Sequence, residues 1–201
     1  MKEMKNVMEF VSTLGLLIIA HEGWAIPNLK LPFPNGETWS ITTGYGGSAY
    51  HSGHDYYAID FNLPGDSDLN KQILAVASGN VIFADWKDEY GWTVDIDHGS
   101  GYTSRYAHLN EKPVVSGSVN QGQEIGKCGM SGGTSTGPHL HFVLYYNGQS
   151  VKPEPMSGYT NFLEGGSYTS DNYFNPASLV ALRSDFNSPS SDDWTTGYDT
   201  Q

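Results

Sequence analysis

The chain has 201 residues, with 22 acidic and 10 basic side chains and a formal net charge of −12 at pH 7. This charge argues against partners that demand a positive protein face, namely nucleic acids and anionic membrane surfaces. The sequence holds one cysteine, Cys128, which excludes an intrachain disulfide and a cysteine-based zinc cluster. A bound metal ion would therefore have to be held by histidine and carboxylate side chains.

Residues 1–25 have the pattern of a signal peptide. Lys2 and Lys5 precede the apolar run Val11–Ala20, and small residues fit a cleavage site after Ala25. The apolar run is shorter than the roughly 20 residues that a transmembrane helix needs. We therefore expect an exported protein, periplasmic or extracellular, without a transmembrane span.

Short strand-like segments follow one another at close spacing, separated by glycine, proline, asparagine and aspartate clusters. Asn147-Gly148 is a two-residue hairpin signal. Outside the apolar run, a helical pattern is confined to Pro176–Arg183, for which we predict a short helix. The predicted strands are Thr38–Thr43, Tyr56–Asn62, Ile73–Ala77, Asn80–Trp86, Trp92–Asp97, Tyr102–Leu109, Val114–Val115, Glu124–Cys128 and His139–Tyr146.

This arrangement predicts an all-β protein, an antiparallel β-sandwich or partly open barrel with short loops. We predict a single domain over residues 26–185, with its core at 38–152. An extension over 153–185 is expected to form a C-terminal hairpin. Residues 186–201 are polar and acidic, which predicts a disordered tail.

The candidate chemistry lies among the seven histidines. His139 and His141 begin a predicted strand, where residues two apart point to the same face, so two imidazoles converge. The loop Ser131–Pro138 before them is rich in glycine and small residues, which suits a peptide-binding mouth. A catalytic zinc site needs three protein ligands and one open position.

Three segments together resemble the lysostaphin-type (LytM-domain) zinc metallopeptidases, which cut peptidoglycan peptides. These segments are Ser135–Phe142 (STGPHLHF), Tyr106–Leu109 (YAHL) and an upstream segment with histidine and aspartate. The resemblance covers Thr38 to Lys152 and is to the staphylolysin-like branch. It implies a LytM-type fold, one Zn²⁺ per chain, and a secreted endopeptidase acting on cross-bridge or stem peptides of peptidoglycan.

The resemblance also implies roles for individual residues. The last histidine of the family's His-x-His motif is a zinc ligand, which corresponds to His141. The other two motif histidines flank the attacking water and carry its proton, which corresponds to His108 and His139. Which of these two is the base stays open.

The two remaining zinc ligands have alternatives. The family's His-x3-Asp spacing is met by His51 and Asp55, but the proline and strand that follow the family's aspartate match Asp60. We therefore predict Asp60 as the carboxylate ligand and His51 as its histidine partner, with a loop inserted between them as in the staphylolysin-like branch. His54 and Asp55 are the alternatives, and the plain reading of Asp55 is a solvated turn carboxylate.

Two further predictions concern single side chains. Tyr168 lies where the staphylolysin-like branch places a tyrosine that stabilises the oxyanion, with Tyr45 as a competitor and a surface aromatic as the plain alternative. His98 lies at a structural position of the family, so we expect a hydrogen-bonded turn histidine rather than a ligand.

Two other functional classes remain possible at this point. One is a non-catalytic LytM-type module that activates a cell-wall amidase, although such modules have usually lost zinc ligands. The other is a secreted β-sandwich that binds the cell wall through aromatic faces. We expect a monomer in each case, and zinc content separates the peptidase from the other two classes.

Overall fold

A computed structural model describes residues 26–133 and 135–173, and the predicted signal peptide, short helix and acidic tail lie outside these residues. Within the described ranges the elements are strands and two 3₁₀ turns, η1 and η2, without an α-helix. They are β1 (Thr38–Thr43), η1 (Gly53–Asp55), β2 (Ile59–Asn62), β3 (Gln72–Leu74), β4 (Gly79–Lys87), η2 (Asp88–Tyr90), β5 (Gly91–Gly99), β6 (Tyr102–Leu109), β7 (Gly117–Val119), β8 (Glu124–Lys127), β9 (Leu140–Tyr146), β10 (Gln149–Val151) and β11 (Ser167–Thr169).

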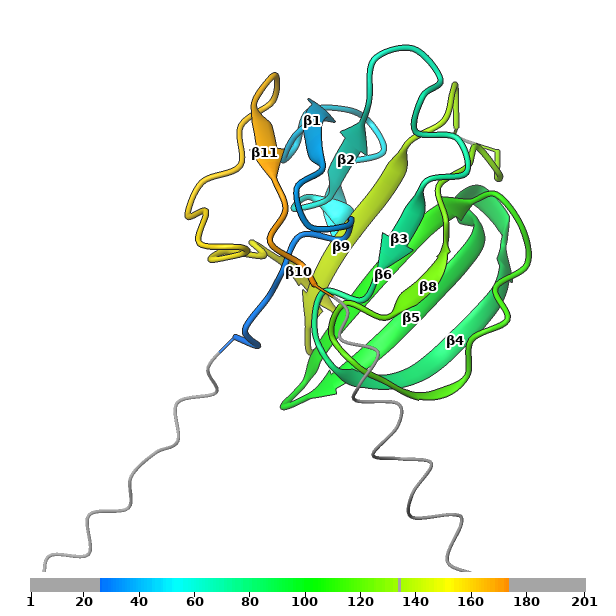
Figure 1. The fold of residues 1–201 in the computed structure, drawn as a ribbon, viewed down its shortest axis with the longest axis vertical. Coiled ribbons are helices and arrows are strands. Elements are labelled where there is room, and N and C mark those ends of the chain that lie inside the picture. Colours follow the sequence, from blue (N-terminus) through cyan, green and yellow to red (C-terminus); the bar gives the residue numbers. More distant parts are fainter. Residues whose placement is uncertain (1–25, 134, 174–201) are drawn as a thin grey trace, which may run out of the picture.

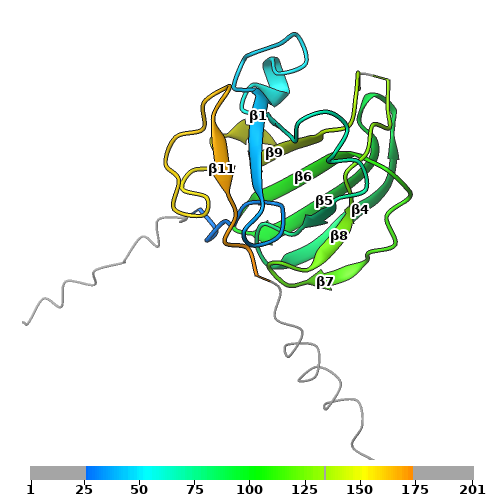
Figure 2. The same ribbon diagram turned by 45° about the horizontal axis from the view of Figure 1, so that its top comes forward.

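The strands form two antiparallel sheets. The large sheet has nine strands in the order β11-β1-β2-β9-β6-β5-β4-β7, with β10 paired to β9, while β3 and β8 form the second sheet. The two-stranded sheet lies across one face of the large sheet, in front of β5 and β6 (Figures 1 and 2). The fold is therefore mostly β, antiparallel and not a closed barrel, as the sequence predicts.

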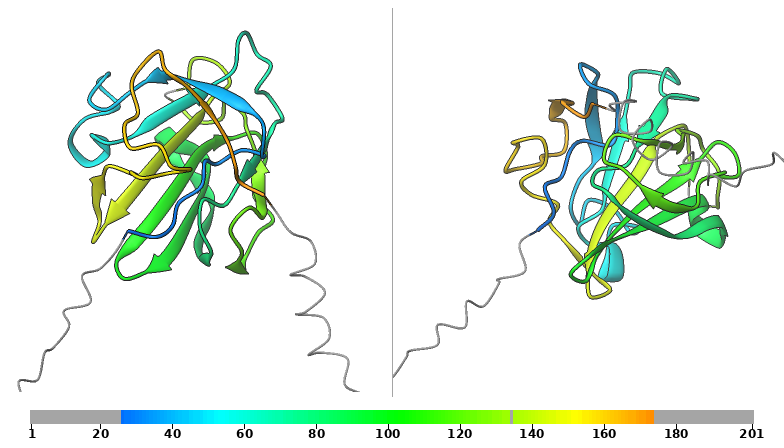
Figure 3. Two further views of the ribbon diagram at one scale, coloured as in Figure 1. Left: turned by 60° about the vertical axis from the view of Figure 1, so that its left-hand side comes forward. Right: turned by 60° about the horizontal axis from the view of Figure 1, so that its bottom comes forward.

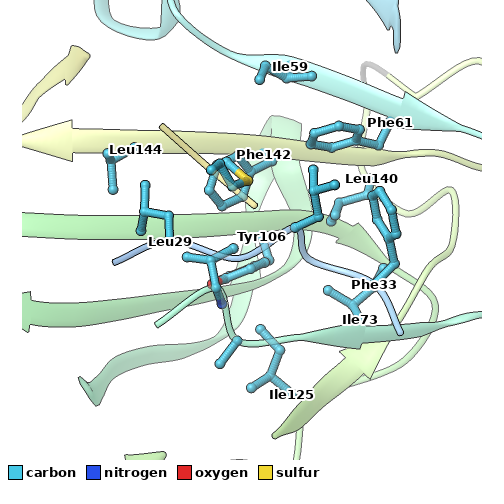
Figure 4. Close-up of a cluster of buried hydrophobic side chains, with 14 of the residues drawn as sticks. Leu29, Phe33, Ile59, Phe61, Ile73, Tyr106, Ile125, Leu140, Phe142 and Leu144 are labelled. Carbon is cyan, nitrogen blue, oxygen red and sulfur yellow. The ribbon is translucent and has the colours of Figure 1, made fainter. Parts of the chain in front are cut away.

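The hydrophobic core fills the space between the two sheets. Ile73 of β3 and Ile125 of β8 face Tyr106 of β6 and Phe142 of β9 (Figure 4). The Tyr106 hydroxyl accepts a hydrogen bond from the Val76 amide at 2.8 Å, which satisfies its polar end inside this core.

Alternation along β9 assigns one set of side chains to the core and the other to the opposite face. Leu140, Phe142 and Leu144 are all fully buried in the core (Figure 4). Successive side chains of a strand point to opposite faces, so His141 and Tyr145 lie on the face away from this core. This second face carries the candidate site.

The predicted bounds of β1 and β6 match the structure, whereas two other predictions are wrong. The 3₁₀ turn η1 is followed by a second turn, closed by a hydrogen bond from the Ala58 amide to the Asp55 carbonyl, so the strand begins at Ile59 rather than Tyr56. The predicted strand at Val114–Val115 is displaced to β7, because it is Val119 that reaches the core while Val114 is fully exposed.

The C-terminal extension adds β11 to the edge of the large sheet beside β1. Thr38 pairs with Thr169 and Trp39 with Tyr168, so β11 of the extension joins the first strand, and within the extension Met156 and Tyr159 close a single antiparallel bridge. Residues 31–36 lie beside residues 170–172 through backbone and side-chain hydrogen bonds (Figure 3). In the part of the chain that is described, no helix has the length and apolar character needed to cross a membrane.

Candidate metal centre and active site

Three of the predicted site residues converge on one point. The ligand atoms of His51, Asp60 and His141 all lie within 4.8 Å of one another. Asp60 Oδ1 is 3.1 Å from His51 Nε2 and 3.0 Å from His141 Nδ1. This cluster combines the residues that sequence reasoning selected from a larger set of histidines and aspartates.

The strand register explains why Asp60 and His141 meet. Asp60 of β2 is paired directly with His141 of β9, and the flanking pairs put Ile59 opposite Phe142 and Phe61 opposite Leu140. Side chains of directly opposed residues project from the same face of a sheet. Because the flanking pairs are buried in the core, Asp60 and His141 are turned to the other face.

His51 comes from the loop between β1 and η1 and is held there by the backbone. Its Nδ1 lies 2.8 Å from the Gly44 carbonyl oxygen, and its side chain is buried. A carbonyl only accepts hydrogen bonds, so Nδ1 carries the proton in the neutral ring. The lone pair on Nε2 therefore points toward Asp60 and is available to a metal ion.

The His141 ring lies between two carboxylates. Asp60 Oδ1 is near Nδ1, and Asp55 Oδ2 is 3.3 Å from Nε2. Burial acts to lower the pKa of His141, but hydrogen bonds to Asp55 and Asp60 outweigh it and raise the pKa to about 9. The two carboxylates thus impose a negative potential on this position, which a cation would satisfy.

Asp55 is not the solvated turn carboxylate that the sequence left open. Its side chain is buried, and it accepts hydrogen bonds from Tyr90, Tyr145, His54 and His141. Burial acts to raise the pKa of Asp55, but these donors outweigh it and hold the pKa below its usual range. Burial likewise acts to raise the pKa of Asp60, but the neighbouring His141, His51 and His139 rings outweigh it and lower that pKa. Both carboxylates are therefore ionised at neutral pH.

His108 and His139 lie beside the cluster with their rings adjacent. Their ring centroids are 4.7 Å apart, and that of His108 is 5.7 Å from the ring of His141. His108 Nδ1 donates to the Ser131 carbonyl at 2.7 Å, and His139 Nδ1 to the Gly137 carbonyl at 2.9 Å. Each neutral ring is therefore left with an unprotonated Nε2.

A break in the regular pleat brings His108 to this face. Strand alternation would direct its side chain toward the core, on the same side as Tyr106. Instead, between the Tyr106–Val94 and Leu109–Trp92 pairs β6 has two residues where β5 has one, and His108 has φ of 60°. This left-handed conformation is uncommon for a non-glycine residue and is often found at functional sites.

Burial keeps His108 neutral. Desolvation, followed by the nearby His139 and His141 rings, lowers the pKa of His108 to about 4. At neutral pH the ring is thus able to accept a proton. A general base needs this state before the chemical step.

These side chains line one open cleft of about 350 Å³. Its walls come from the β1–η1 loop, the η2 turn, the ends of β2, β6 and β9, and the loop before β9. The lining residues are Thr43, Ser48, Ala49, Tyr50, His51, Ser52, His54, Asp55, Asp60, Glu89, Tyr90, His108, Thr136, His139 and His141.

The structure does not bring Tyr168 to this cleft, so the prediction of an oxyanion-stabilising role for it is wrong. Tyr168 is paired with Trp39, whose ring is fully buried, and therefore points into the core. Its hydroxyl accepts a hydrogen bond from the Leu163 amide at 2.7 Å. The competitor Tyr45 also lies outside the cleft lining, with its hydroxyl donated to Glu154.

Sequence reasoning missed the residues that surround Asp55. Tyr90 and Tyr145 each donate a hydroxyl to it at 2.6 Å. Tyr145 is four residues after His141 on the same strand, so alternation could have placed it on the same face. Tyr90 ends a short 3₁₀ turn and carries no such signal.

His98 is a hydrogen-bonded histidine away from the cleft, as predicted. Its Nδ1 donates to the Ser78 carbonyl at 2.9 Å, and its Nε2 lies 2.7 Å from the Ser104 hydroxyl. Burial lowers the pKa of His98.

The donor set of the cluster fits a zinc ion. Two imidazole nitrogens and one carboxylate oxygen are typical zinc ligands, and ligands about 2.0–2.1 Å from a tetrahedral ion lie roughly 3.3 Å apart. The separations of about 3 Å from Asp60 Oδ1 to His51 and His141 match this arrangement. His51 and His141 would hold such an ion through Nε2 and Nδ1, with Asp60 as the third ligand.

Comparisons with known proteins relate the chain to a peptidase family. The model of peptidase family M23 matches residues 54–153. The murein hydrolase activator EnvC of Escherichia coli is 41% identical over 88 residues, which cover 43% of this chain and 21% of EnvC. The DD-carboxypeptidase/endopeptidase Mpg of Neisseria meningitidis is 38% identical over 116 residues, which cover 58% of this chain and 23% of Mpg. The chain thus spans under a quarter of the length of these two curated relatives.

A solved structure described as a zinc-containing peptidase from Vibrio cholerae has a similar fold. Its TM-score is 0.52 at 25% sequence identity, and the match covers 68% of this chain and 41% of that one.

Proposed function

The chain belongs to peptidase family M23, and on that premise we propose that it is an exported zinc endopeptidase that hydrolyses peptide bonds of peptidoglycan. The observation that carries this proposal is the cluster of His51, Asp60 and His141 at the base of an open cleft. The adjacent rings of His108 and His139 supply proton carriers beside that cluster.

When bound, zinc supplies a Lewis acid that polarises a carbonyl group and acidifies water. His51, Asp60 and His141 would hold the ion, and their positions are set by the hydrogen bond to the Gly44 carbonyl and by the pairing of β2 with β9. The cleft beside them admits an extended peptide with its scissile carbonyl toward the cluster.

His108 and His139 move the protons in this proposal. With Nδ1 of each ring donated to a backbone carbonyl, Nε2 is the atom that accepts a proton from the attacking water and returns it to the leaving amine. The described part of the cleft lining has one glutamate, Glu89, in the η2 turn, so the two histidines are the better placed proton carriers.

The similarity to EnvC keeps a second function under consideration, that of a non-catalytic activator of a cell-wall hydrolase. The retention of a full His/Asp/His set and two further histidines supports the peptidase instead. An activator needs a surface for its partner enzyme and has no use for a metal site or a proton carrier in a cleft.

Digestion of purified peptidoglycans that differ in their cross-bridges tests the proposal. The chain alone should release peptide fragments of defined mass, a chelator should stop the release, and added Zn²⁺ should restore it. The variant His141→Ala, checked for folding by circular dichroism, serves as the matched control and should be inactive. Failure of the zinc-loaded chain to cut any of these substrates, together with stimulation of a separate amidase, would support the activator.

A further inference from the structure

Asp55 is neither a member of the predicted ligand cluster nor a solvated turn carboxylate. It lies outside the His51–Asp60–His141 cluster, yet it contacts His141 from the side opposite to Asp60. We propose that Asp55 is a positioning residue whose carboxylate fixes the ring and the tautomer of His141, so that Nδ1 faces the metal ion. This inference rests on the proposed zinc site.

The tautomer argument follows from hydrogen-bonding chemistry. An ionised carboxylate only accepts hydrogen bonds, so Asp55 Oδ2 at 3.3 Å from Nε2 would keep the proton of His141 on Nε2 when a metal ion replaces the proton on Nδ1. The lone pair then lies on Nδ1, which faces Asp60 Oδ1. A carboxylate behind a ligating histidine in this way sets the ring orientation and strengthens the ligand.

Four donors fix the carboxylate of Asp55 itself. Oδ1 accepts from Tyr145 at 2.6 Å and from His54 at 2.9 Å, while Oδ2 accepts from Tyr90 at 2.6 Å and from His141. All four partners are donors, so both side-chain atoms that face them at residue 55 must be hydrogen-bond acceptors. An amide in place of the carboxylate would have to turn its NH₂ group toward two of these donors.

Arg105 extends the support behind the two tyrosines. Its Nη1 donates to the Tyr145 hydroxyl at 2.9 Å, and its guanidinium lies over the rings of Tyr90 and Tyr145 at 4.8 and 5.0 Å. Nε and Nη2 make paired hydrogen bonds to Asp95 at 2.8 and 2.9 Å. Both tyrosines are thereby held in place, and with them the carboxylate of Asp55.

The elements that carry these residues come from distant parts of the chain. Asp55 ends η1, Tyr90 ends η2, Arg105 lies on β6, and Tyr145 lies on β9 together with His141. The η1 turn is thus attached to the sheet through a buried polar network that ends at a metal ligand. A merely structural attachment of η1 would not need to reach His141.

Asp55→Asn tests the proposal, because it keeps the size of the side chain and removes one acceptor side. Zinc affinity is measured by competition with a chromogenic chelator, and His141 is followed in the zinc-loaded protein by ¹H–¹⁵N spectra of the imidazole rings. We expect a 10- to 100-fold loss of zinc affinity, the size of effect that follows from loss of an outer partner of a metal ligand. In these spectra the His141 Nε2–H signal should shift, because its hydrogen bond to a carboxylate is lost.

Asp97→Asn is the control, since it removes the same charge at a partly buried aspartate outside the cleft. Asp97 accepts a hydrogen bond from the Gly99 amide and lies six residues after Gly91, the first residue of β5. It should bind zinc as the wild type does. An equal loss of zinc affinity in both variants would show that the change in net charge causes it, and would overturn the proposal. If Asp55→Asn does not fold, Tyr145→Phe decides the matter: a several-fold loss of zinc affinity supports the proposal, and an unchanged affinity overturns it.

The two proposals fail in different ways. Wild-type chain that takes up no zinc overturns the zinc site and the role of Asp55 together. Wild-type chain that binds one zinc ion, with Asp55→Asn binding it within twofold as tightly and with the same His141 spectrum, overturns the role of Asp55 alone.

Discussion

Asp60 and His141 are directly opposed residues on antiparallel strands, and 3.0 Å separates Asp60 Oδ1 from His141 Nδ1. The large sheet therefore assembles two of the three proposed ligands when β2 pairs with β9. His51, the third, depends on a loop that the Gly44 carbonyl holds in place.

The proton-carrying role of His108 predicts a loss of rate without a loss of metal. His108→Gln keeps a polar side chain but removes the basic Nε2, so turnover should fall about 10²- to 10⁴-fold, the contribution typical of general acid–base catalysis. Zinc content, measured by elemental analysis, should remain that of the wild type. His139→Gln should behave alike, and full turnover in either variant would contradict the assignment for that histidine.

The burial of Tyr168 in the core predicts that its hydroxyl matters for stability and not for catalysis. Tyr168→Phe leaves the Leu163 amide without its acceptor, which should lower the free energy of unfolding by about 1–3 kcal/mol. Peptidoglycan cleavage at a temperature well below the unfolding transition should stay within twofold of wild type. A hundredfold loss of turnover with stability unchanged would contradict this prediction and assign Tyr168 a role in catalysis.

The lowered pKa of His98 predicts how stability depends on pH. Because the folded-state pKa lies below the ordinary value of 6.5, the unfolded chain binds this proton more readily than the folded one. The folded state therefore keeps its full stability above pH 6.5 and loses stability as the pH falls below that value. Urea unfolding should show a smaller loss between pH 7 and pH 5 for His98→Gln than for the wild type.

An equal slope in both proteins would contradict the assignment for His98. Both are compared at the same zinc occupancy, because metal release also depends on pH.

The sequence predicts those parts of the fold in which local pattern and tertiary role agree. β1 and β6 contain β-branched and aromatic residues, and their bounds are as predicted. β10 and β11 have three residues each and few apolar ones, so their pairing depends on β9 and β1 rather than on their own composition. Such strands form through their partners and leave little signal in the sequence.

The candidate site divides in the same manner. His139 and His141 follow from strand periodicity, and His51 with Asp60 from motif spacing. The role of Asp55 cannot be predicted from the sequence, because it depends on the hydroxyl groups of Tyr90 and Tyr145, which lie 35 and 90 residues further along the chain. The left-handed backbone at His108 is likewise a tertiary feature, since strand alternation alone would turn that ring into the core.

The position of a bound zinc ion tests the account most directly. An anomalous difference map from zinc-loaded crystals, recorded at the zinc absorption edge, locates the ion without reference to activity. The account predicts one peak per chain, about 2.0–2.2 Å from His51 Nε2, Asp60 Oδ1 and His141 Nδ1, and no peak there in crystals of Asp60→Asn. A peak bound by His54 or Asp55 instead, or no peak in the cleft of the wild type, would contradict it.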